Sequence, residues 1–344
     1  MSGTASFPGP ASSRGLPFSD HPFWADVPEI TDDLRRIHEL VVQEAGAAGG
    51  PIGNALSQYV ARPGKMLRPG FVLIGSWAGR GRPDRPVDDR LVQIAAAIEV
   101  LHLATLIHDD VIDDADRRRG EPSLHALYGR KQAVLMGDFL LSRCFSMIAE
   151  GTERENALRL AAAVGHLVRG EINQMFEAGS DAFSRRAYLR RIAGKTATLF
   201  GLSLVTGASE TKTPPAQGAK LARAGYNLGM AFQVIDDILD FTARADAIGK
   251  PVASDLRAGI YTLPVVVAVS RDPQIRALVV PPPSDEAGIR RAVEAIRNAG
   301  GLSAARSSAA AYTARAHRAI GGLAEPRLRE ALGSVAGKLL DREY

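Results

Sequence analysis

The sequence of 344 residues is poor in cysteine and has no long uninterrupted apolar run. Its one cysteine, Cys144, excludes an intramolecular disulfide and fits a reducing cytoplasm, where we expect the chain to lie. A membrane span needs about 18 or more consecutive apolar residues. The nearest stretch, residues 91–107, is interrupted by Gln93, Glu99 and His102. The sequence therefore predicts no transmembrane segment.

The chain also lacks a strong excess of charge and a targeting segment. Its net charge of +4 arises from 42 basic and 38 acidic residues, which argues against a nucleic-acid binder with concentrated basic residues. Residues 1–21 are rich in Gly, Pro and Ser but lack a basic segment followed by an apolar core. We expect them to be a disordered tail, not a signal peptide. Residues 22–344 are long enough to form one large domain.

No run alternates between apolar and polar residues as a strand would, whereas helical periodicity is found along most of the chain. Turn-forming residues such as Pro63-Gly64 and Thr213-Pro214-Pro215 separate the periodic stretches. Apolar residues recur at three- and four-residue spacing in residues 34–42, 91–115, 133–148, 157–176, 188–205, 219–241, 262–269, 286–299, 304–320 and 326–340. The sequence therefore predicts an all-α single domain of about ten or more helices.

What the chain does contain is one acidic pattern in two copies. Asp109-Asp110-Val111-Ile112-Asp113 and Asp236-Asp237-Ile238-Leu239-Asp240 each end a long apolar stretch. In a helix, the first and last carboxylates of each copy lie on one face, where they repel one another and oppose the helix dipole. Cations relieve this repulsion, and hard oxygen ligands without His or Cys in ligand spacing favour Mg²⁺. Because Mg²⁺ completes its shell with water and phosphate oxygens, the pattern predicts a diphosphate held between two helices.

Basic residues accompany the first cluster. Arg117-Arg118-Arg119 follows it directly, and acids for metal beside arginines for phosphate suit a diphosphate ligand. Upstream, Lys65 and Arg68 lie three residues apart at a loop-to-helix junction, where both can converge on one anion. Each feature alone is ordinary for a solvated, charged surface. The second cluster of equal spacing favours the metal-diphosphate interpretation.

Polar residues inside otherwise apolar helices form a further set of candidates. They are Glu99, His102, Lys195, Thr196 and Gln233. Gln233 lies one helical turn before Asp236 and therefore on the same side of its helix. For each of them, a polar core residue satisfied by its neighbours is the ordinary alternative. The loop after the second cluster contains Lys250 and Ser254-Asp255 and is a candidate lid over a phosphate site.

These residues resemble the motifs of the trans-type polyprenyl diphosphate synthases, which have the all-helical isoprenoid synthase fold with a central substrate cavity. The resemblance extends over residues 34–344. The segments that carry it are Gly64-Lys65-Met66-Leu67-Arg68-Pro69, His108-Asp109-Asp110-Val111-Ile112-Asp113, Asp116 with Arg118-Arg119-Gly120, Gly137-Asp138, Lys195-Thr196-Ala197, Phe232-Gln233-Val234-Ile235-Asp236-Asp237-Ile238-Leu239-Asp240, Gly249-Lys250-Pro251 and Thr262-Leu263-Pro264.

The resemblance implies a prenyltransferase that condenses isopentenyl diphosphate head-to-tail onto an allylic diphosphate. It implies three Mg²⁺ ions, two held by Asp109 and Asp113 and the third by Asp236. Further candidate ligands are Asp110, Asp237 and Asp240. The cations implied for the allylic diphosphate are Arg118, Lys195 and Lys250. The residues implied for isopentenyl diphosphate are Lys65, Arg68, His102 and Arg119. The residues implied to line the reacting centre are Thr196 and Gln233.

Two positions depart from the family pattern. Many relatives have Arg where this chain has Met66, so one cation near the isopentenyl site is missing. Many short-chain relatives have Lys after the glycine that precedes Thr-Leu-Pro, whereas Gly259 is followed here by Ile260-Tyr261. Family members usually form homodimers, and a long product brings transient contact with a membrane. We expect the same of this chain.

Two other functions compete with this interpretation. A terpene cyclase of the same fold uses one diphosphate substrate and usually has Asn and Ser in its second metal motif, whereas this chain has a second aspartate cluster and a second anion site at Lys65 and Arg68. A non-catalytic subunit of a heteromeric synthase is expected to have lost aspartates from one cluster, and both clusters are intact here.

The length of the product is predicted from the helix that precedes Asp109. Ala104, Leu101 and Ala97 lie within roughly 60° of one another on this helix, about 7, 12 and 18 Å below Asp109. Farnesyl-producing relatives typically have an aromatic floor at the position of Ala104. Its absence, with Thr105 beside it, predicts a product longer than farnesyl, of about thirty carbons or more on the depth of this tunnel. Geranylgeranyl diphosphate is the alternative if Leu101 or a residue of the helix over 133–148 closes the tunnel. Close packing between helices is the ordinary role of both alanines.

Overall fold

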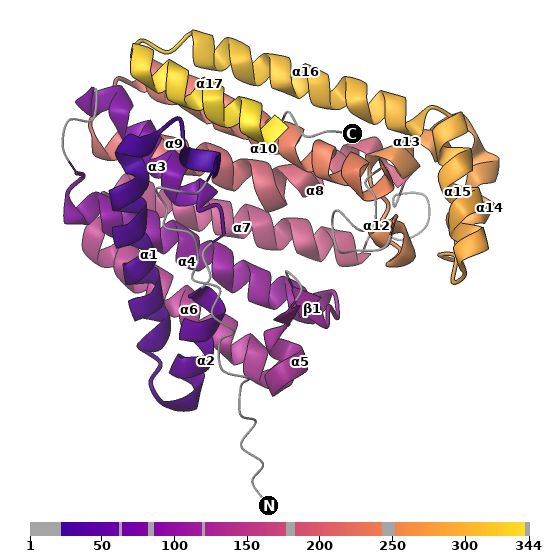
Figure 1. Cartoon of the computed structure of the whole chain (residues 1–344), viewed down its shortest axis with the longest axis horizontal. Coiled ribbons are helices and arrows are strands. Elements are labelled where there is room, and N and C mark those ends of the chain that lie inside the picture. The colour runs from indigo at the N-terminus through magenta and orange to yellow at the C-terminus, as the bar shows by residue number, and fades with distance from the viewer. Residues whose placement is uncertain are drawn as a thin grey trace, which may run out of the picture.

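The computed structural model describes residues 22–61, 64–81, 86–118, 121–176, 183–242 and 252–340. These residues form the predicted helical bundle, with one two-residue antiparallel pair, β1 (Arg117–Arg118) and β2 (Glu121–Pro122) (Figure 1). The helices are α1 (Thr31–Gly46), α2 (Gly50–Val60), α3 (Leu67–Arg80), α4 (Asp89–Ile112), α5 (Leu124–Tyr128), α6 (Arg130–Gly151), α7 (Arg154–Phe176), α8 (Arg185–Ile192), α9 (Thr198–Glu210), α10 (Pro215–Thr242), α12 (Ser254–Arg257), α13 (Leu263–Arg271), α14 (Arg276–Val279), α15 (Glu286–Asn298), α16 (Gly301–Gly321) and α17 (Pro326–Leu340). The predicted tail, Arg119 and Lys250 lie outside the described residues.

Helix α4 runs through the interior of the bundle because it is apolar on nearly all sides. Asp88 caps its start, where the side chain accepts a hydrogen bond from the backbone N–H of Leu91 at 2.9 Å. The sequence predicted that this helix continues to Ala115, which is wrong: the helix ends at Ile112. Asp113 takes the capping position, and Asp114 has a left-handed backbone with φ of 52°. The first acidic cluster therefore lies on the last turn of α4 and the turn that follows it.

The predicted helix over residues 188–205 is interrupted in its middle. Between α8 and α9 lies one turn of π-helix, η5 (Ala193–Ala197), where the backbone N–H of Thr198 donates to the carbonyl of Ala193. The Thr198 hydroxyl donates to the same carbonyl at 2.8 Å. A π-turn adds one residue to the helix and rotates the side chains on either side of it, and such turns are frequent at functional sites. This turn contains Lys195 and Thr196.

The sequence analysis also missed two helices of more than ten residues, α2 and α3, and the short helices α5, α12 and α14. Helix α3 is deeply buried, with Phe71, Leu73 and Trp77 among its core residues. The proline and glycine near its start are typical of turns. Pro69 nevertheless fits the first turn of a helix, where the backbone N–H that proline lacks would have no partner within the helix. The short helix η2 (Pro22–Trp24) packs against this start, and a side chain at Gly70 would collide with the ring of Trp24.

Helices α4 and α6 are each long and apolar enough to cross a membrane, judged by length and composition alone. That test tolerates the few polar residues that interrupt the run in the sequence. The apolar window of α4 is 67% buried within the bundle, as in the core helix of a folded domain. The window of α6 is only 39% buried, because one face of α6 is exposed. That face includes Val134, Leu135 and Phe145.

Candidate active site

The first acidic cluster combines buried and exposed carboxylates. Asp109 and Asp110 are buried at the end of α4, whereas Asp113 and Asp114 are exposed beyond it. The backbone N–H of Asp113 donates to the carbonyl of Asp109 at 2.8 Å, which keeps the two residues one helical turn apart. Asp109 and Asp113 therefore share one side of the helix end, as their spacing predicted.

Asp110 is held by Arg118 of β1. The Nε atom of Arg118 donates to both carboxylate oxygens of Asp110, each at 2.8 Å. Burial raises the pKa of Asp110, and the charge of Arg118 opposes that rise. Because Nε alone makes these bonds, the two terminal nitrogens of the Arg118 guanidinium can still donate to another anion.

Two carboxylates of the second cluster are bound by protein donors. Asp237 is buried, and its oxygens accept from the hydroxyl of Tyr188 at 2.5 Å and from Nε2 of Gln233 at 3.1 Å. Burial raises the pKa of Asp237 to about 7. Asp240 accepts from the backbone N–H of Ser254 at 3.0 Å, its hydroxyl at 2.6 Å and the backbone N–H of Asp255 at 3.1 Å. The half-buried Asp236 is the third carboxylate of this cluster.

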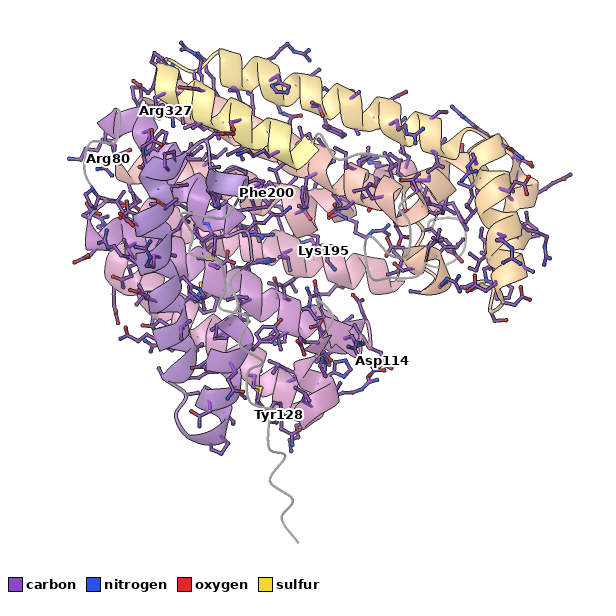
Figure 2. All side chains as sticks on the ribbon, in the orientation of Figure 1. Arg80, Asp114, Tyr128, Lys195, Phe200 and Arg327 are labelled. Carbon is purple, nitrogen blue, oxygen red and sulfur yellow. The ribbon has the colours of Figure 1, made fainter. Side chains whose placement is uncertain are left out.

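The π-turn η5 joins the two clusters. Nζ of Lys195 lies 3.0 Å from a carboxylate oxygen of Asp109 on α4. The hydroxyl of the next residue, Thr196, donates to Oε1 of Gln233 on α10 at 2.9 Å. Figure 2 shows Lys195 in the middle of the bundle, with Asp114 beyond the end of α4. The structure thus brings together Asp109, Lys195, Thr196 and Gln233 from three distant segments of the sequence.

The cations before and at the start of α3 form a second group. The indole N–H of Trp24 donates to the carbonyl of Lys65 at 2.7 Å and fixes the loop, and Met66 adopts a left-handed backbone at the cap of α3. The guanidinium of Arg68 lies 5.4 Å from the centroid of the Phe200 ring. That ring lies 5.8 Å from the ring of Phe232, the residue before Gln233.

Two ring contacts therefore connect Arg68 to α10, at the residue before Gln233. The Nζ atom of Lys65 lies 5.5 Å from the centroid of the Phe23 ring. His102 is half-buried on α4, and its carbonyl accepts from the hydroxyl of Thr105 at 2.7 Å. The shared role of these three residues stays a prediction.

The three predicted product-length residues are all buried on α4. Ala97, Leu101 and Ala104 have exposed fractions of 0%, 1% and 0%. On the same helix, His102 and Thr105 are partly accessible below Asp109. Thr105 is the neighbour of the buried Ala104, whose role in product length stays a prediction.

The described residues contain no compact group of three His, Cys, Asp or Glu side chains ready to hold a metal ion. The two clusters instead offer carboxylates from two helices. This donor set fits Mg²⁺, which usually takes one or two protein carboxylates and completes its shell with water and substrate phosphates. A cage made only of protein ligands is therefore not required.

The sequence analysis missed Tyr188, which lies in the network around Asp237. The signal was present but weak: Tyr188 lies seven residues, or two helical turns, before Lys195. On an apolar helix face an aromatic residue is usually taken as core. Only the position of Asp237, 49 residues further along the chain, identifies the partner of its hydroxyl.

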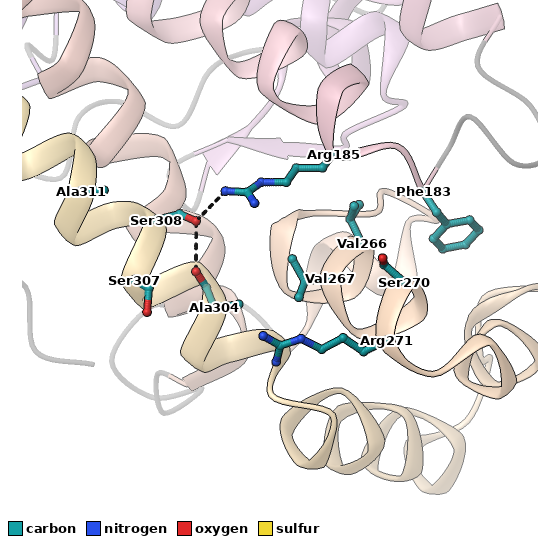
Figure 3. Close-up of a pocket in the computed structure, with 10 residues that line it drawn as sticks. All are labelled: Phe183, Arg185, Val266, Val267, Ser270, Arg271, Ala304, Ser307, Ser308 and Ala311. Atoms are coloured by element: carbon teal, nitrogen blue, oxygen red, sulfur yellow. Dashed lines mark hydrogen bonds between the residues drawn. The ribbon is translucent and has the colours of Figure 1, made fainter.

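A surface pocket of about 520 Å³ lies away from both clusters, between α13 and α16 (Figure 3). Arg185 and Arg271 enter it from opposite sides, and Arg185 donates to the Ser308 hydroxyl at 3.4 Å. Arg271 donates to the carbonyls of Ala299 and Gly300 at 3.0 and 2.9 Å. None of the residues that line this pocket belongs to either aspartate cluster.

Comparison with known proteins agrees with this geometry. The family model of the polyprenyl synthetases matches residues 51–296. The chain belongs to the polyprenyl synthetase family. It is thus a polyprenyl diphosphate synthase, a prenyltransferase. Component 2 of the heptaprenyl diphosphate synthase of Geobacillus stearothermophilus is 35% identical over 92% of this chain and 97% of that protein. The nonaprenyl diphosphate synthase of Mycobacterium tuberculosis is 32% identical over 90% and 92%.

Solved structures of this family have the same fold. A geranylgeranyl pyrophosphate synthase from Lactobacillus brevis has a TM-score of 0.86 and 31% identity over 94% of this chain and all of that one. A polyprenyl synthase from Caulobacter crescentus has a TM-score of 0.81 and 32% identity over 92% and 96%. The second structure contains calcium and isoprenyl diphosphate. Family members thus bind divalent cations and isoprenyl diphosphates.

Proposed function

We propose that this protein condenses isopentenyl diphosphate head-to-tail onto an allylic diphosphate and makes an all-trans polyprenyl diphosphate longer than farnesyl. The observation that carries the proposal is the link between the clusters. Lys195 contacts Asp109 on α4, and the adjacent Thr196 contacts Gln233 on α10. One short segment thus places a cation and a hydroxyl between two acidic helix ends, where a diphosphate and its metal ions have complementary charges.

Magnesium ions would be held by Asp109, Asp113 and Asp236, with three ions in all. The other three carboxylates are bound by protein donors. Asp110 accepts two bonds from Arg118, and Asp237 and Asp240 accept bonds from donors of α8, α10 and α12. When bound, Mg²⁺ supplies Lewis-acid stabilisation of the charge on a departing diphosphate.

The chain's own residues bind and orient the two substrates. Lys195, Arg118 and Lys250 donate hydrogen bonds to the allylic diphosphate, whose negative charge grows as its C–O bond breaks. Isopentenyl diphosphate is held by Lys65, Arg68, His102 and Arg119, so that its double bond attacks the allylic carbon in line. A new C–C bond forms and one proton leaves, with the released diphosphate as its acceptor. Thr196 and Gln233 line the centre, from which water must be excluded.

A product of about thirty carbons or more is supported by the small residues Ala104 and Ala97 on α4, about 7 and 18 Å below Asp109. The heptaprenyl and nonaprenyl synthases among the relatives are consistent with this length. Geranylgeranyl diphosphate is the alternative, since a synthase of that product has the same fold with 31% identity. The buried Leu101 is the residue that would close the tunnel at that length.

A homodimer is the proposed assembly, and α6 offers the surface for it. Val134, Leu141 and Phe145 are seven and four residues apart and therefore lie on one side of the helix. Val134 and Phe145 are 38% and 49% exposed, and a patch of exposed apolar residues on one helix face is a candidate interaction surface. Covering this face would bury apolar surface, so we expect size-exclusion chromatography under assay conditions to give about twice the mass of one chain. Elution as a monomer would contradict this assembly.

A second candidate is that the chain needs a different partner subunit. It is favoured by one observation, that the relative from Geobacillus stearothermophilus is named as component 2 of its synthase. Against a purely non-catalytic role, both aspartate clusters are complete in this chain. A terpene cyclase is less well supported, because its second metal motif usually contains Asn and Ser.

One experiment separates these candidates. The purified full-length chain is incubated alone with labelled isopentenyl diphosphate, Mg²⁺ and either a farnesyl or a geranylgeranyl primer. We expect extended polyprenyl diphosphates, whose length is resolved by chromatography after dephosphorylation. Cyclised products from the primer alone would identify a cyclase, and no product at all would indicate a subunit that needs a partner. We also propose that the enzyme acts in the cytoplasm and contacts a membrane transiently when it releases a long product.

A further inference from the structure

The hydroxyl of Tyr188 is buried against one carboxylate of the second cluster. Tyr188 is 1% exposed on α8, and its hydroxyl donates to Asp237 on α10 at 2.5 Å. This distance is typical of a charge-assisted O–H···O bond, which is stronger than a bond between neutral groups. The rest of the Tyr188 side chain packs in the core, with the Arg191 guanidinium 5.6 Å from its ring centroid. A phenylalanine would fill the same space and lose only the hydroxyl.

Asp237 also connects Tyr188, through hydrogen bonds, to Gln233 and Thr196, the two residues proposed to line the reacting centre. Its other oxygen accepts from Nε2 of Gln233 at 3.1 Å, and Oε1 of Gln233 accepts from the Thr196 hydroxyl at 2.9 Å. These two contacts turn the NH₂ of the Gln233 amide toward Asp237 and its carbonyl oxygen toward the Thr196 hydroxyl. The orientation of Gln233 is thus imposed by Asp237 and not by solvent.

The chain of bonds ends beside the first cluster. Thr196 and Lys195 are neighbours in the π-turn η5, and Nζ of Lys195 lies 3.0 Å from Asp109. The series Tyr188–Asp237–Gln233–Thr196 therefore fixes η5 against α10, while Lys195 holds the same turn against α4. Movement of Tyr188 would change the separation of the two acidic helix ends on which the proposed reaction depends.

We propose that Tyr188 is a positioning residue for prenyl transfer, acting through Asp237 to fix η5 between the two aspartate clusters. This inference rests on the proposed function. It assigns Asp237 a role in orientation, whereas Asp236 is the carboxylate that would hold a metal ion. Tyr188 is expected to control the rate of the chemical step, because the network touches the reacting centre but not the Lys65 and Arg68 cations that are proposed to bind isopentenyl diphosphate.

The test compares Tyr188→Phe with wild type in steady-state assays of the full chain with both substrates varied. We expect kcat to fall on the order of ten- to a hundredfold, as for the loss of a charge-assisted bond that orients a catalytic group. The KM for isopentenyl diphosphate should stay within about twofold, because a mutation that acts only on the transition state leaves ground-state binding unchanged. Tyr312→Phe is the matched control: this half-buried hydroxyl makes no hydrogen bond with any described residue, and the variant should keep wild-type kcat.

A double-mutant cycle distinguishes positioning from a general loss of packing. Asp237→Asn should lower kcat by a similar factor, and the double variant should be no slower than Asp237→Asn alone, because both changes break one chain of bonds. Losses that multiply, a wild-type kcat in Tyr188→Phe, or a fall in kcat matched by Tyr312→Phe would each overturn the proposal. Thermal melting confirms that each variant is folded at the assay temperature. If wild type itself transfers no prenyl group, the proposed function fails instead, so the two failures are distinguishable.

Discussion

The two aspartate clusters have the same spacing in the sequence but different surroundings in the fold. At the end of α4, Asp109 contacts Lys195, Asp110 is bound by Arg118, and Asp113 is exposed. At the end of α10, protein donors bind both Asp237 and Asp240. The first cluster therefore presents carboxylates beside cations that can bind an anion. In the second cluster, two carboxylates accept hydrogen bonds from neighbouring helices.

This difference shows that equal spacing does not give equal roles. A carboxylate whose oxygens already accept from buried donors has little to gain from a metal ion, since those donors would lose their acceptor. A carboxylate beside a cation and solvent can exchange these partners for Mg²⁺ and phosphate. We therefore expect one ligand from the second cluster and two from the first, and the predictions below test that division.

The largest effect is expected from the three proposed metal ligands. Asp109→Ala, Asp113→Ala or Asp236→Ala should each cut kcat by several orders of magnitude, because stabilisation of the departing diphosphate is lost in the transition state. Circular dichroism should show an intact helical fold. Near wild-type turnover in any of these variants at saturating Mg²⁺ would remove that residue from the assignment.

A smaller effect is expected at the cations beside the first cluster. Arg68→Ala should raise the KM for isopentenyl diphosphate much more than the KM for the allylic primer. Loss of a charge-assisted phosphate contact costs on the order of 1.5–3 kcal/mol, or roughly ten- to a hundredfold in binding. Steady-state kinetics with each substrate varied separately measure both constants. Equal changes would mean that the two anion sites are misassigned.

The second cluster should affect stability as well as rate. Asp240→Ala removes the acceptor of three hydrogen bonds from Ser254 and Asp255. We expect a loss of about 1–3 kcal/mol in the free energy of unfolding, since donors are left without their acceptor. Denaturant unfolding measures it. Asp113→Ala, at an exposed carboxylate of the first cluster, is the control and should unfold like wild type. Equal stability of the two variants would contradict the proposed division.

The smallest effect on turnover is expected below the first cluster. Ala104→Phe should shift the main product to farnesyl or geranylgeranyl diphosphate while the first condensation survives, because the ring would block growth about 7 Å below Asp109. Chromatography of dephosphorylated products measures the shift. Ala104 is fully buried, so the fold is checked by thermal melting. An unchanged product distribution in a folded variant would show that the tunnel does not pass this side of α4.

The sequence predicted the all-helical fold and most helix cores because their apolar residues repeat with the helical period. It also identified both clusters, since carboxylates crowded at the end of an apolar helix repel one another and therefore indicate bound cations. The π-turn at Lys195 was not predictable, because it depends on how α8 and α9 pack against neighbouring helices. Helix α3 was missed because Pro69 and Gly70 resemble turn signals, although both suit the tightly packed start of that helix.

Contacts between residues that are distant in the sequence could not be predicted either. Nothing local distinguishes Asp236 from Asp237, which are neighbours of identical type. Their different surroundings arise because successive helix residues point about 100° apart, so only Asp237 meets Tyr188. Arg118 was predicted to bind phosphate from its position after the first cluster, yet its partner in the fold is Asp110.

The most direct test of the division between the clusters is a Mg²⁺ titration of two neighbouring, isosteric variants, Asp236→Asn and Asp237→Asn. Single-turnover transfer of labelled isopentenyl diphosphate is followed in each. For Asp236→Asn we expect loss of the reaction by about a thousandfold or more at every Mg²⁺ concentration, because a proposed ligand is gone. For Asp237→Asn we expect a loss of roughly ten- to a hundredfold with the half-saturating Mg²⁺ concentration unchanged, because only an orienting bond is weakened. Equal losses, or a higher Mg²⁺ requirement in Asp237→Asn alone, would contradict the division.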